Sequence, residues 1–491
     1  MTISDITTSD ITTSDLANSD LANSGIAGST ATRSHRAETV RVLCGATVLL
    51  PGDPGFDEAR TPWNLAVDQR PAAVAFPTNA EETAEVVRAA VDAGLRVAPQ
   101  STGHNAGPLG RLDDVVIVRT SGMDSVQIDP VRQRARVGGG AIWLPVVQAA
   151  AAEGFAVLHG SSPDVGVAGY SLGGGIFLYA RKLGLQTNSI TGVQIVTADG
   201  SIVWADATEN AELFWAIRGG GGNFGIVTAL EFAIFPFDTT YAGMMVWDRR
   251  DTERVLRGWL AWAADAPDEV TTSFRVLNLP PLPDIPEPFR GRQLVVIDGA
   301  VLASDQRGSE ILSALRDLGP ELDTFGRVPV ASLARLHMDP EGPTPGASNA
   351  VVLAGMPEEA IRAFVDLAGP ASQSTLLVNE IRQLGGALSR PHPGAGAMPT
   401  LDGEFLVLGA GIAATPEMGA AARRDADRLV AAMHPFRAGR QYLNFVEHAA
   451  DPSSGYDPVT WGRLVTIKTA YDVDAVIVAN HPVRRTFEIE D

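Results

Sequence analysis

The chain has 491 residues, a length that predicts two or more domains. Hydrophobic residues make up 45% of it, which is enough for ordinary buried cores. The formal net charge of −20 argues against a nucleic-acid or anionic-membrane partner, because binding to phosphates needs clustered Lys and Arg. The single cysteine, Cys44, excludes an intrachain disulfide and a Cys-rich metal site, so no metal is expected.

The N-terminus carries a five-residue repeat whose first copy is Ser4-Asp5-Ile6-Thr7-Thr8. Its Ser, Thr, Asp and Asn residues cannot bury a core, so residues 1–36 are predicted to form a disordered tail. The repeat lacks the basic and apolar regions of a secretory signal, and no stretch approaches the ~18–20 apolar residues of a membrane span. We therefore expect a cytoplasmic protein without a membrane partner.

Ordered structure is expected from about Glu38, and the first clear element is a helix that follows Asn79. Asn79 can cap this helix, Glu82 can complete a capping box, and Gly94 ends it. Its predicted apolar face consists of Ala84, Val87, Ala90 and Val91. Short strands are expected over 95–98, 115–118 and 134–137, and a helix over 142–153. This order of elements is typical of an α/β or α+β fold.

The next segment, 157–175, is dense in Gly and Ser and is predicted to be a loop, with a possible helix over 176–183. Residues 194–204 have the pattern of a hairpin that turns at Ala198-Asp199-Gly200. A helix over 212–217, a glycine-rich segment and a strand over 226–235 complete this part of the chain.

The composition changes after Pro236, which suggests a second domain. Helical patterns are expected over 305–318, 357–367 and 415–433. Strands are expected over 293–298, 374–383, 404–413 and, last, 441–447.

Two short motifs suggest other functions. Residues 169–173 match the G-x-S-x-G elbow of α/β-hydrolases, with Ser171 as nucleophile and Asp199 with His434, His448 or His481 as partners. That motif needs a buried strand before the serine, and residues 160–166 do not form one. Residues 220–225 match G-x-G-x-x-G, but a strand follows where a dinucleotide fold requires a helix.

Three glycine-rich loops remain, over 101–107, 160–175 and 218–225. Several glycines together let the backbone approach a ligand closely. Three such loops in one domain favour one large planar ligand over ordinary turn chemistry.

These loops resemble segments of the FAD-linked oxidoreductases of the vanillyl-alcohol-oxidase type, which carry a PCMH-type FAD-binding domain, and most closely the berberine-bridge-enzyme-like branch. The matching residues begin with Pro71, Val74 and Pro77 before the capped helix, and the second match is Ser101-Thr102-Gly103-His104-Asn105-Ala106-Gly107. Further matches are Gly166–Gly169 with Gly173–Gly175, Arg181–Leu185, Phe214–Val227, Tyr442–Phe445, Arg463-Leu464, Lys468 and Tyr471-Asp472.

The resemblance implies an α+β fold. It consists of a two-subdomain FAD-binding domain over 37–237 and a substrate domain over 238–430 with an antiparallel sheet covered by helices. A C-terminal segment, 431–491, would return to complete the FAD site. The resemblance also implies FAD linked through His104 Nδ1 to the flavin 8α-methyl. In members with a second link a Cys stands at the position of Ser162, and a serine hydroxyl is not expected to add to flavin, so one link is expected.

The site residues that follow from the resemblance fall into two groups. For substrate chemistry we expect Tyr442, Glu380 and Gln383, with Tyr442 as base or orienting group. Alternation along a strand puts Glu380 with Arg382 on one face and Ile381 with Gln383 on the other, so only one pair can face the substrate. Glu380 with Arg382 could equally be a surface pair. The expected FAD-binding residues are Ser101, Thr102, Gly103, His104, Asn105, Gly107, Ser162, Gly166, Val167, Gly169, Gly173, Gly174, Val227, Tyr442 and Asn444.

The predicted function is that of an oxidase that takes a hydride from an alcohol, sugar or specialised metabolite to flavin N5. Oxygen is the expected electron acceptor, which gives hydrogen peroxide, since small Val167 and Ala168 would not obstruct it. A dehydrogenase, a serine hydrolase and a non-catalytic flavin-binding protein remain as alternatives. The expected partner is a small-molecule substrate, and the protein would be a monomer or homodimer.

Overall fold

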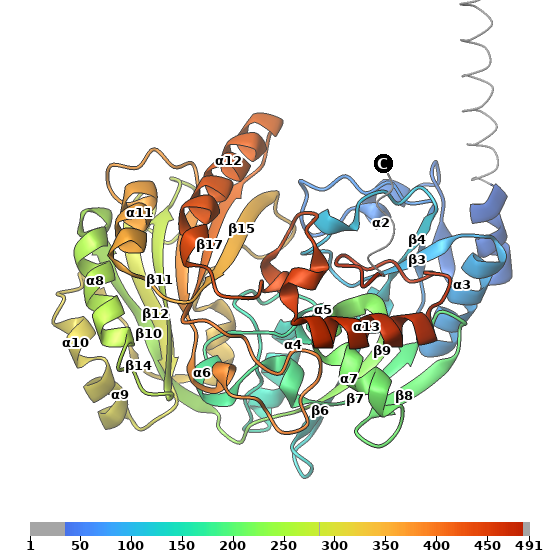
Figure 1. Cartoon of the computed structure of the whole chain (residues 1–491), viewed down its shortest axis with the longest axis horizontal. Coiled ribbons are helices and arrows are strands. Elements are labelled where there is room, and N and C mark those ends of the chain that lie inside the picture. Colours follow the sequence, from blue (N-terminus) through green and yellow to red (C-terminus); the bar gives the residue numbers. More distant parts are fainter. Residues whose placement is uncertain (1–34, 284, 485–491) are drawn as a thin grey trace, which may run out of the picture.

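The computed structural model describes residues 35–283 and 285–484, which form three β-sheets with helices around them (Figure 1). The predicted tail falls outside these residues except for its last two, which lie in a helix over 35–43 of the described residues. The two smaller sheets come from the N-terminal half of the chain, and the largest sheet comes from the C-terminal half.

The first sheet has four strands in the order β1-β2-β4-β3. Their bounds are β1 Thr47–Leu49, β2 Ala73–Phe76, β3 Arg96–Gln100 and β4 Val115–Arg119. Strands β2 and β3 both pair in parallel with β4, and helices α2 (Phe56–Arg60) and α3 (Ala80–Asp92) belong to this part of the chain. The predicted cap is present, since the Asn79 side chain accepts a hydrogen bond from Glu82 N. Val91 is 43% exposed, so it does not belong to the buried face of α3.

The second sheet is antiparallel, with the strand order β5-β6-β9-β7-β8. Its strands are β5 Val126–Asp129, β6 Arg134–Gly138, β7 Ile190–Val196, β8 Ile202–Asp206 and β9 Ile226–Ala233. Helices α4 (Trp143–Ala152), α5 (Val167–Leu172), α6 (Ala180–Leu183) and α7 (Ala211–Gly220) belong to the same part of the chain. The core that contains Trp143, Phe224 and Phe232 lies against this sheet. The predicted hairpin is the β7–β8 pair.

The third sheet has eight antiparallel strands, in the order β13-β10-β12-β11-β16-β17-β15, with β14 also paired to β10. The strands are β10 Thr239–Asp248, β11 Val270–Asn278, β12 Gln293–Val301, β13 Leu322–Asp323, β14 Gly326–Pro329, β15 Gly346–Leu353, β16 Val378–Gln383 and β17 Phe405–Ile412. Helices α8 (Thr252–Ala263), α9 (Asp305–Ile311), α10 (Ser313–Arg316), α11 (Glu358–Ala368) and α12 (Pro416–Met433) cover its outer face (Figure 1). The other face is therefore left to meet the first two sheets.

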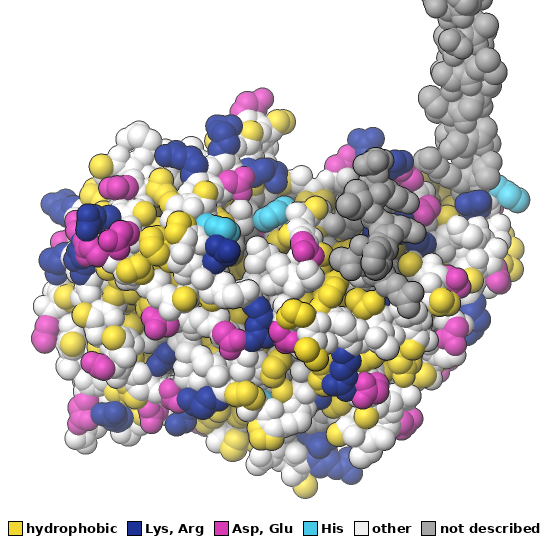
Figure 2. Space-filling model, viewed as in Figure 1, with side chains coloured by type: hydrophobic (Ala, Val, Ile, Leu, Met, Phe, Trp, Pro, Cys, Tyr) yellow, Lys and Arg dark blue, Asp and Glu magenta, His cyan; other side chains and the backbone are white. Residues whose placement is uncertain are grey.

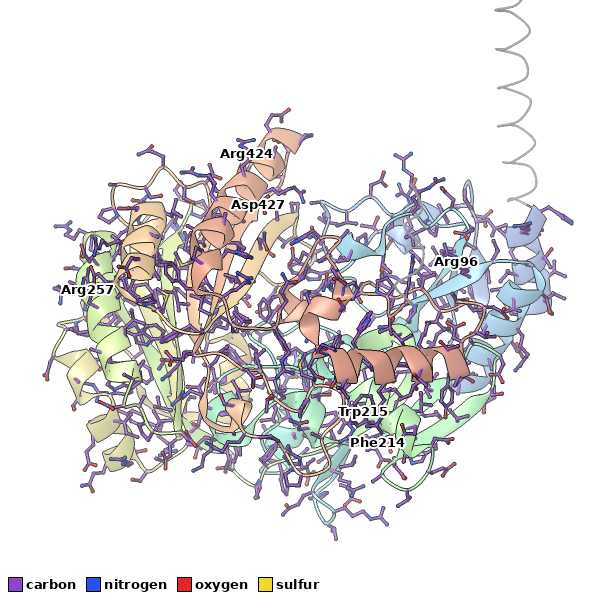
Figure 3. All side chains as sticks on the ribbon, in the orientation of Figure 1. Arg96, Phe214, Trp215, Arg257, Arg424 and Asp427 are labelled. Carbon is purple, nitrogen blue, oxygen red and sulfur yellow. The ribbon has the colours of Figure 1, made fainter. Side chains whose placement is uncertain are left out.

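The C-terminal segment returns to the two smaller sheets, as the resemblance implied. Helix α13 (Pro458–Tyr471) packs on α7, where Arg463 lies 3.8 Å from the ring centre of Trp215, a residue labelled in Figure 3. Beyond α13 the chain runs beside β3 in a parallel bridge between Val97 and Ile477. Lys468 fixes the returning segment, because its Nζ donates to Asn223 O at 2.7 Å and to Asp472 Oδ2 at 2.5 Å.

Several predicted elements need correction. The segment 157–175 is not all loop, since its apolar residues Val167–Leu172 form α5. The possible helix over 176–183 is only α6, and the helix over 305–318 is broken into α9 and α10 at Leu312. The predicted strand over 441–447 is a 3₁₀ turn over Leu443–Phe445, because it pairs with no neighbouring strand.

The surface carries charged side chains of both signs. On the face shown in Figure 2, Lys and Arg side chains alternate with Asp and Glu, so this face offers no broad basic patch for nucleic acid. In the described part of the chain, no helix combines the length and apolar composition needed to cross a bilayer. The same residues contain no cluster of three or more His, Cys, Asp or Glu side chains arranged for a metal ion.

Candidate functional site

A cavity of about 480 Å³ lies where the three sheets meet. It is lined by the predicted loops, by the inner face of β15, β16 and β17, and by the returning C-terminal segment. The predicted site residues that line it are Ser101, Thr102, Gly103, His104, Asn105, Ser162, Gly166, Gly169, Gly173, Val227, Glu380, Tyr442 and Asn444. Segments that are hundreds of residues apart in the sequence are thus brought to one space.

Four predicted site residues do not line this cavity. Val167 is buried in the core of the second sheet, so it is not at an open flavin face either. Gly107 and Gly174 serve close packing: a Cβ would lie 2.3 Å from Glu447 O at Gly107 and 2.8 Å from the Tyr442 ring at Gly174. Gln383 faces the opposite side of β16, where Thr272 Oγ1 donates to its Oε1 at 3.1 Å.

The His104 ring is held on three sides. It stacks on Trp63 with ring centres 3.9 Å apart and an interplanar angle of 18°. Its Nδ1 lies 2.8 Å from Thr102 Oγ1, and its Nε2 lies 3.4 Å from Asp164 Oδ1. The loop reaches this position through Gly103, which has φ +86° and whose Cβ would lie 2.6 Å from Pro62.

Asp164 is a carboxylate that other groups hold in place. Trp63 Nε1 and Gly342 N each donate to its Oδ2 at 2.7 Å, and Ser162 Oγ donates to its Oδ1 at 2.7 Å. Burial raises the pKa of Asp164, but the nearby His104 and the hydrogen bonds from Ser162, Trp63 and Gly342 outweigh it and hold this pKa below its usual value. Neither Asp164 nor Trp63 was predicted as a site residue from the sequence, since neither stands in a recognised motif.

Tyr442 also lines the cavity and is 3% exposed. Its phenolic oxygen accepts hydrogen bonds from Gly175 N at 2.8 Å and from Asn444 Nδ2 at 3.2 Å. Because both lone pairs are used, the phenolic proton is free to point into the cavity. Burial raises the pKa of Tyr442 to about 12, while Asn444, Gly175 and the charge of Arg382 lower it. The neutral phenol can therefore donate to a substrate oxygen or nitrogen at neutral pH.

The packing of Ile381 decides which of the two faces of β16 meets the cavity. Ile381 packs in the core beneath the helices, so Val378, Glu380 and Arg382 face the cavity. Glu380 and Arg382 are only 1% and 6% exposed, which rules out a surface pair. Arg382 Nε donates to Glu380 Oε1 at 2.6 Å, and the guanidinium lies 5.0 Å from the ring centre of Phe445.

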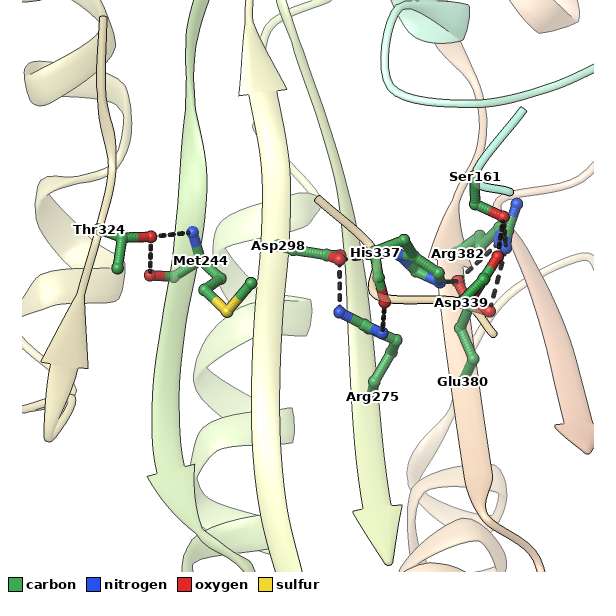
Figure 4. Close-up of polar contacts among 9 residues, drawn as sticks. All are labelled: Ser161, Met244, Arg275, Asp298, Thr324, His337, Asp339, Glu380 and Arg382. Atoms are coloured by element: carbon green, nitrogen blue, oxygen red, sulfur yellow. Dashed lines mark hydrogen bonds and ion pairs between the residues drawn. The ribbon is translucent and has the colours of Figure 1, made fainter. Parts of the chain in front are cut away.

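Strand register brings two further charged residues to this face (Figure 4). Arg275 on β11 is opposite Glu380, and Asp298 on β12 is opposite Ser273, which in turn is opposite Arg382. Arg275 Nη2 donates to Asp298 Oδ2 at 2.6 Å. A charged residue inside an otherwise apolar strand, as in Leu294-Val295-Val296-Ile297-Asp298, is a signal that could have revealed this cluster.

His337 joins the two carboxylates of this cluster. Its Nδ1 lies 2.8 Å from Asp298 Oδ2, and its Nε2 lies 3.4 Å from Glu380 Oε1. Burial and Arg275 lower the pKa of His337, but Asp298, Glu380 and Asp339 raise it further, to about 9. Burial raises the pKa of Glu380, and the charges of Arg382 and His337 outweigh it and lower this pKa below its usual value. Glu380 is therefore a paired carboxylate and not a free base.

The protonation of His337 gives a pH-dependent stability. Its pKa rises on folding from 6.5 to about 9, so its contribution is complete below about pH 6.5 and is lost as the pH rises through about 9. We expect the free energy of unfolding of the wild type to fall between pH 7 and 10 by more than that of His337→Gln. Urea unfolding across this range measures both. His434→Gln, on the exposed side of the fold, should behave like the wild type.

The hydrolase alternative is wrong. Ser171 lies inside α5, after the loop 160–166, and not on a turn that follows a buried strand. Its hydroxyl is buried and has no hydrogen-bond partner in the described structure. Asp199, its suggested partner, instead accepts hydrogen bonds from Thr197 and Ser201 within the hairpin.

The cavity has features that fit a large polar cofactor such as FAD. Buried Ser101 Oγ and Asn105 Oδ1 line it and have no partner among the described residues, and the same holds for both ring nitrogens of His481. Bare backbone from Gly219 to Gly222 forms another part of the wall. Unpartnered donors and acceptors beside open glycine backbone are what a phosphate- and ribose-bearing ligand needs.

Comparisons with known proteins agree with this geometry. A family model described as an FAD binding domain matches residues 71–206. The chain is 37% identical over 224 residues to (R)-6-hydroxynicotine oxidase of Paenarthrobacter nicotinovorans, which covers 45% of this chain and 48% of that relative. The chain therefore spans about half the length of this curated relative.

Solved structures show the same fold over nearly the whole chain. Wild-type Physcomitrella patens BBE-like 1 superposes with a TM-score of 0.79 at 21% identity, over 92% of this chain and 99% of that one. Glucooligosaccharide oxidase from Acremonium strictum, described with a 6-S-cysteinyl, 8α-N1-histidyl FAD, gives a TM-score of 0.76 at 23% identity, over 91% and 99%.

The matched domain and the fold together support the sequence resemblance. Residues 71–206 match an FAD binding domain, and the chain has the fold of Physcomitrella patens BBE-like 1 and of the glucooligosaccharide oxidase. The α+β fold class predicted from the sequence is confirmed.

Proposed function

We propose that this protein is an FAD-dependent oxidase that takes a hydride from an alcohol, a sugar or a specialised metabolite and passes the electrons to oxygen, giving hydrogen peroxide. The observation that carries the proposal is the single cavity that joins the His104 loop to the buried Tyr442 and Arg382. Similarity to a 6-hydroxynicotine oxidase and a glucooligosaccharide oxidase supports the oxidase class.

The protein residues would divide the work between cofactor and substrate. The loops over 101–105 and 160–173 and the backbone of 219–222 would hold FAD, which supplies the hydride acceptor when bound. Tyr442 would orient the substrate oxygen or nitrogen through its phenolic proton and exchange a proton with it. Arg382, fixed by Glu380, would favour negative charge that develops near Tyr442.

The test of this activity is an anaerobic titration of the purified yellow protein. The panel would include 6-hydroxynicotine, glucooligosaccharides and apolar alcohols, and the flavin absorbance band reports reduction. We expect at least one compound to bleach the band, and air to restore it rapidly with formation of hydrogen peroxide. Reduction followed by only slow reoxidation in air would indicate a dehydrogenase, and no reduction by any compound would count for a non-catalytic flavin protein.

FAD would be linked covalently at one point, through His104. Ser162 cannot supply a thiol, and its hydroxyl is already bonded to Asp164. We expect the wild type to keep its yellow colour after acid precipitation and His104→Ala to release its flavin or to be isolated without it. Absorbance of the redissolved pellet measures this, and acid-stable colour in His104→Ala would place the link elsewhere.

A further inference from the structure

The contacts of the His104 ring bear on its tautomer as well as on its position. Trp63 covers one face of the ring, Thr102 Oγ1 meets Nδ1, and Asp164 lies beside Nε2. A ring that stacks on Trp63, meets Thr102 at Nδ1 and has Asp164 Oδ1 3.4 Å from Nε2 cannot turn over without losing these contacts. The two nitrogens therefore keep different partners, and the partner of one decides which carries the proton.

The Asp164 carboxylate can only accept hydrogen bonds. Trp63, Gly342 and Ser162 donate to it, each at 2.7 Å, which keeps it ionised and fixes its direction. A carboxylate beside Nε2 favours the tautomer that carries its hydrogen on Nε2. Nδ1 is then left with a lone pair, toward which the Thr102 hydroxyl can donate.

We propose that Asp164 is a positioning residue for covalent flavin attachment. It holds His104 as the Nε2–H tautomer, so that Nδ1 is the nucleophile, and it stabilises the imidazolium that forms when Nδ1 becomes bonded to carbon. This inference rests on the proposed function, which places the flavin link at His104. Ser162 then has a role of its own, because its hydroxyl orients the Asp164 carboxylate where other members of the class attach a second sulfur link.

The attachment step balances with oxygen as the oxidant. A bond forms between Nδ1 and the flavin 8α carbon, and one C–H bond of that methyl group breaks. The methyl hydrogen and the Nε2 proton leave as protons, and the electron pair of the broken C–H bond reduces the flavin, which takes up two protons in all. Oxygen then takes two electrons and two protons from the reduced flavin and becomes hydrogen peroxide.

Asp164→Asn tests the proposal in the purified holoprotein. The readout is the acid-stable fraction of total flavin, measured by absorbance before and after acid precipitation, with peptide mass spectrometry to locate the link. We expect the acid-stable fraction to fall about tenfold or more, the size typical of losing a partner that orients an imidazole, while flavin still binds. An unchanged fraction would overturn the proposal.

A matched control and a second variant complete the test. Asp199→Asn alters a carboxylate with a similar set of hydroxyl and backbone donors in the β7–β8 turn, and it should leave the acid-stable fraction unchanged. If Asp164→Asn does not fold, Trp63→Phe keeps the stacked ring but removes one hydrogen bond to Asp164, and it should lower the fraction to a lesser degree. A wild-type fraction from Trp63→Phe would then overturn the proposal.

The wild-type protein distinguishes a failure of the proposed covalent link from a failure of the proposed role of Asp164. If wild-type flavin is entirely released by acid, the covalent link in the proposed function is wrong. If the wild type keeps acid-stable flavin and Asp164→Asn keeps it equally, only the role of Asp164 is wrong.

Discussion

Tyr442→Phe is expected to lower kcat by about 10²- to 10⁴-fold, the usual range for losing a positioned acid or base. The phenol is the group that combines burial, two fixed donors to its oxygen and access to the cavity. Stopped-flow reduction of the flavin by the best substrate of the panel would measure the loss. The flavin should remain bound and acid-stable, because Tyr442 makes none of the contacts that surround the His104 ring.

The pH profile gives this prediction a second readout. Since the pKa of Tyr442 is raised to about 12, the wild-type reduction rate should increase with alkaline pH, and the variant should lose that increase. Tyr179→Phe is the control. The Tyr179 phenol is buried like that of Tyr442, but it has no hydrogen-bond partner in the described structure and does not line the cavity. A Tyr442→Phe enzyme that is less than fivefold slower would remove Tyr442 from the chemistry.

Arg275→Met is expected to destabilise the protein by about 3–5 kcal/mol at neutral pH, the range for removing one partner of a buried ion pair. Arg275 is 2% exposed and donates to Asp298, which is fully buried. Its removal leaves His337 as the remaining partner of this carboxylate. Urea unfolding of the two proteins measures the difference in free energy.

The exposed Arg257 provides the matched control. It pairs with Glu358 between α8 and α11 on the outer surface, where solvent screens the charges, so Arg257→Met should destabilise the protein far less than Arg275→Met. The pH dependence has a definite sign as well. Burial raises the pKa of Asp298, and Arg275 is the largest influence that lowers it, so the penalty of Arg275→Met should shrink as acid protonates the carboxylate. Equal losses from Arg257→Met and Arg275→Met would contradict the buried-pair explanation.

Some elements could be predicted because their signals are local. The Asn79 cap lies within one turn of the helix that it starts, and the turn at 198–200 lies between the two strands that it joins. The glycine-rich loops were also recognisable, since small residues and bare backbone are needed along one continuous stretch. The strand pattern of the segment 441–447 was weaker. This segment contains a 3₁₀ turn and has no strand partner.

The substrate side of the cavity could not be predicted in the same way. Alternation showed that Glu380 and Arg382 share a face of β16, but only the packing of Ile381 beneath α11 and α12 decided that this face is the inner one. The same packing places Gln383, an expected catalytic residue, on the face of β16 that points away from the cavity. Which of two faces is buried depends on elements far away in the sequence.

The sequence by itself therefore determined the glycine-rich loops and the α+β fold class, because those features are carried by contiguous residues. Only the tertiary structure brought Asp164 and Trp63, 101 residues apart in sequence, to the same imidazole. It also buried Asp298, Arg275 and His337 beside Glu380. These are contacts between distant segments, and strand register and sheet packing create them without leaving a local pattern.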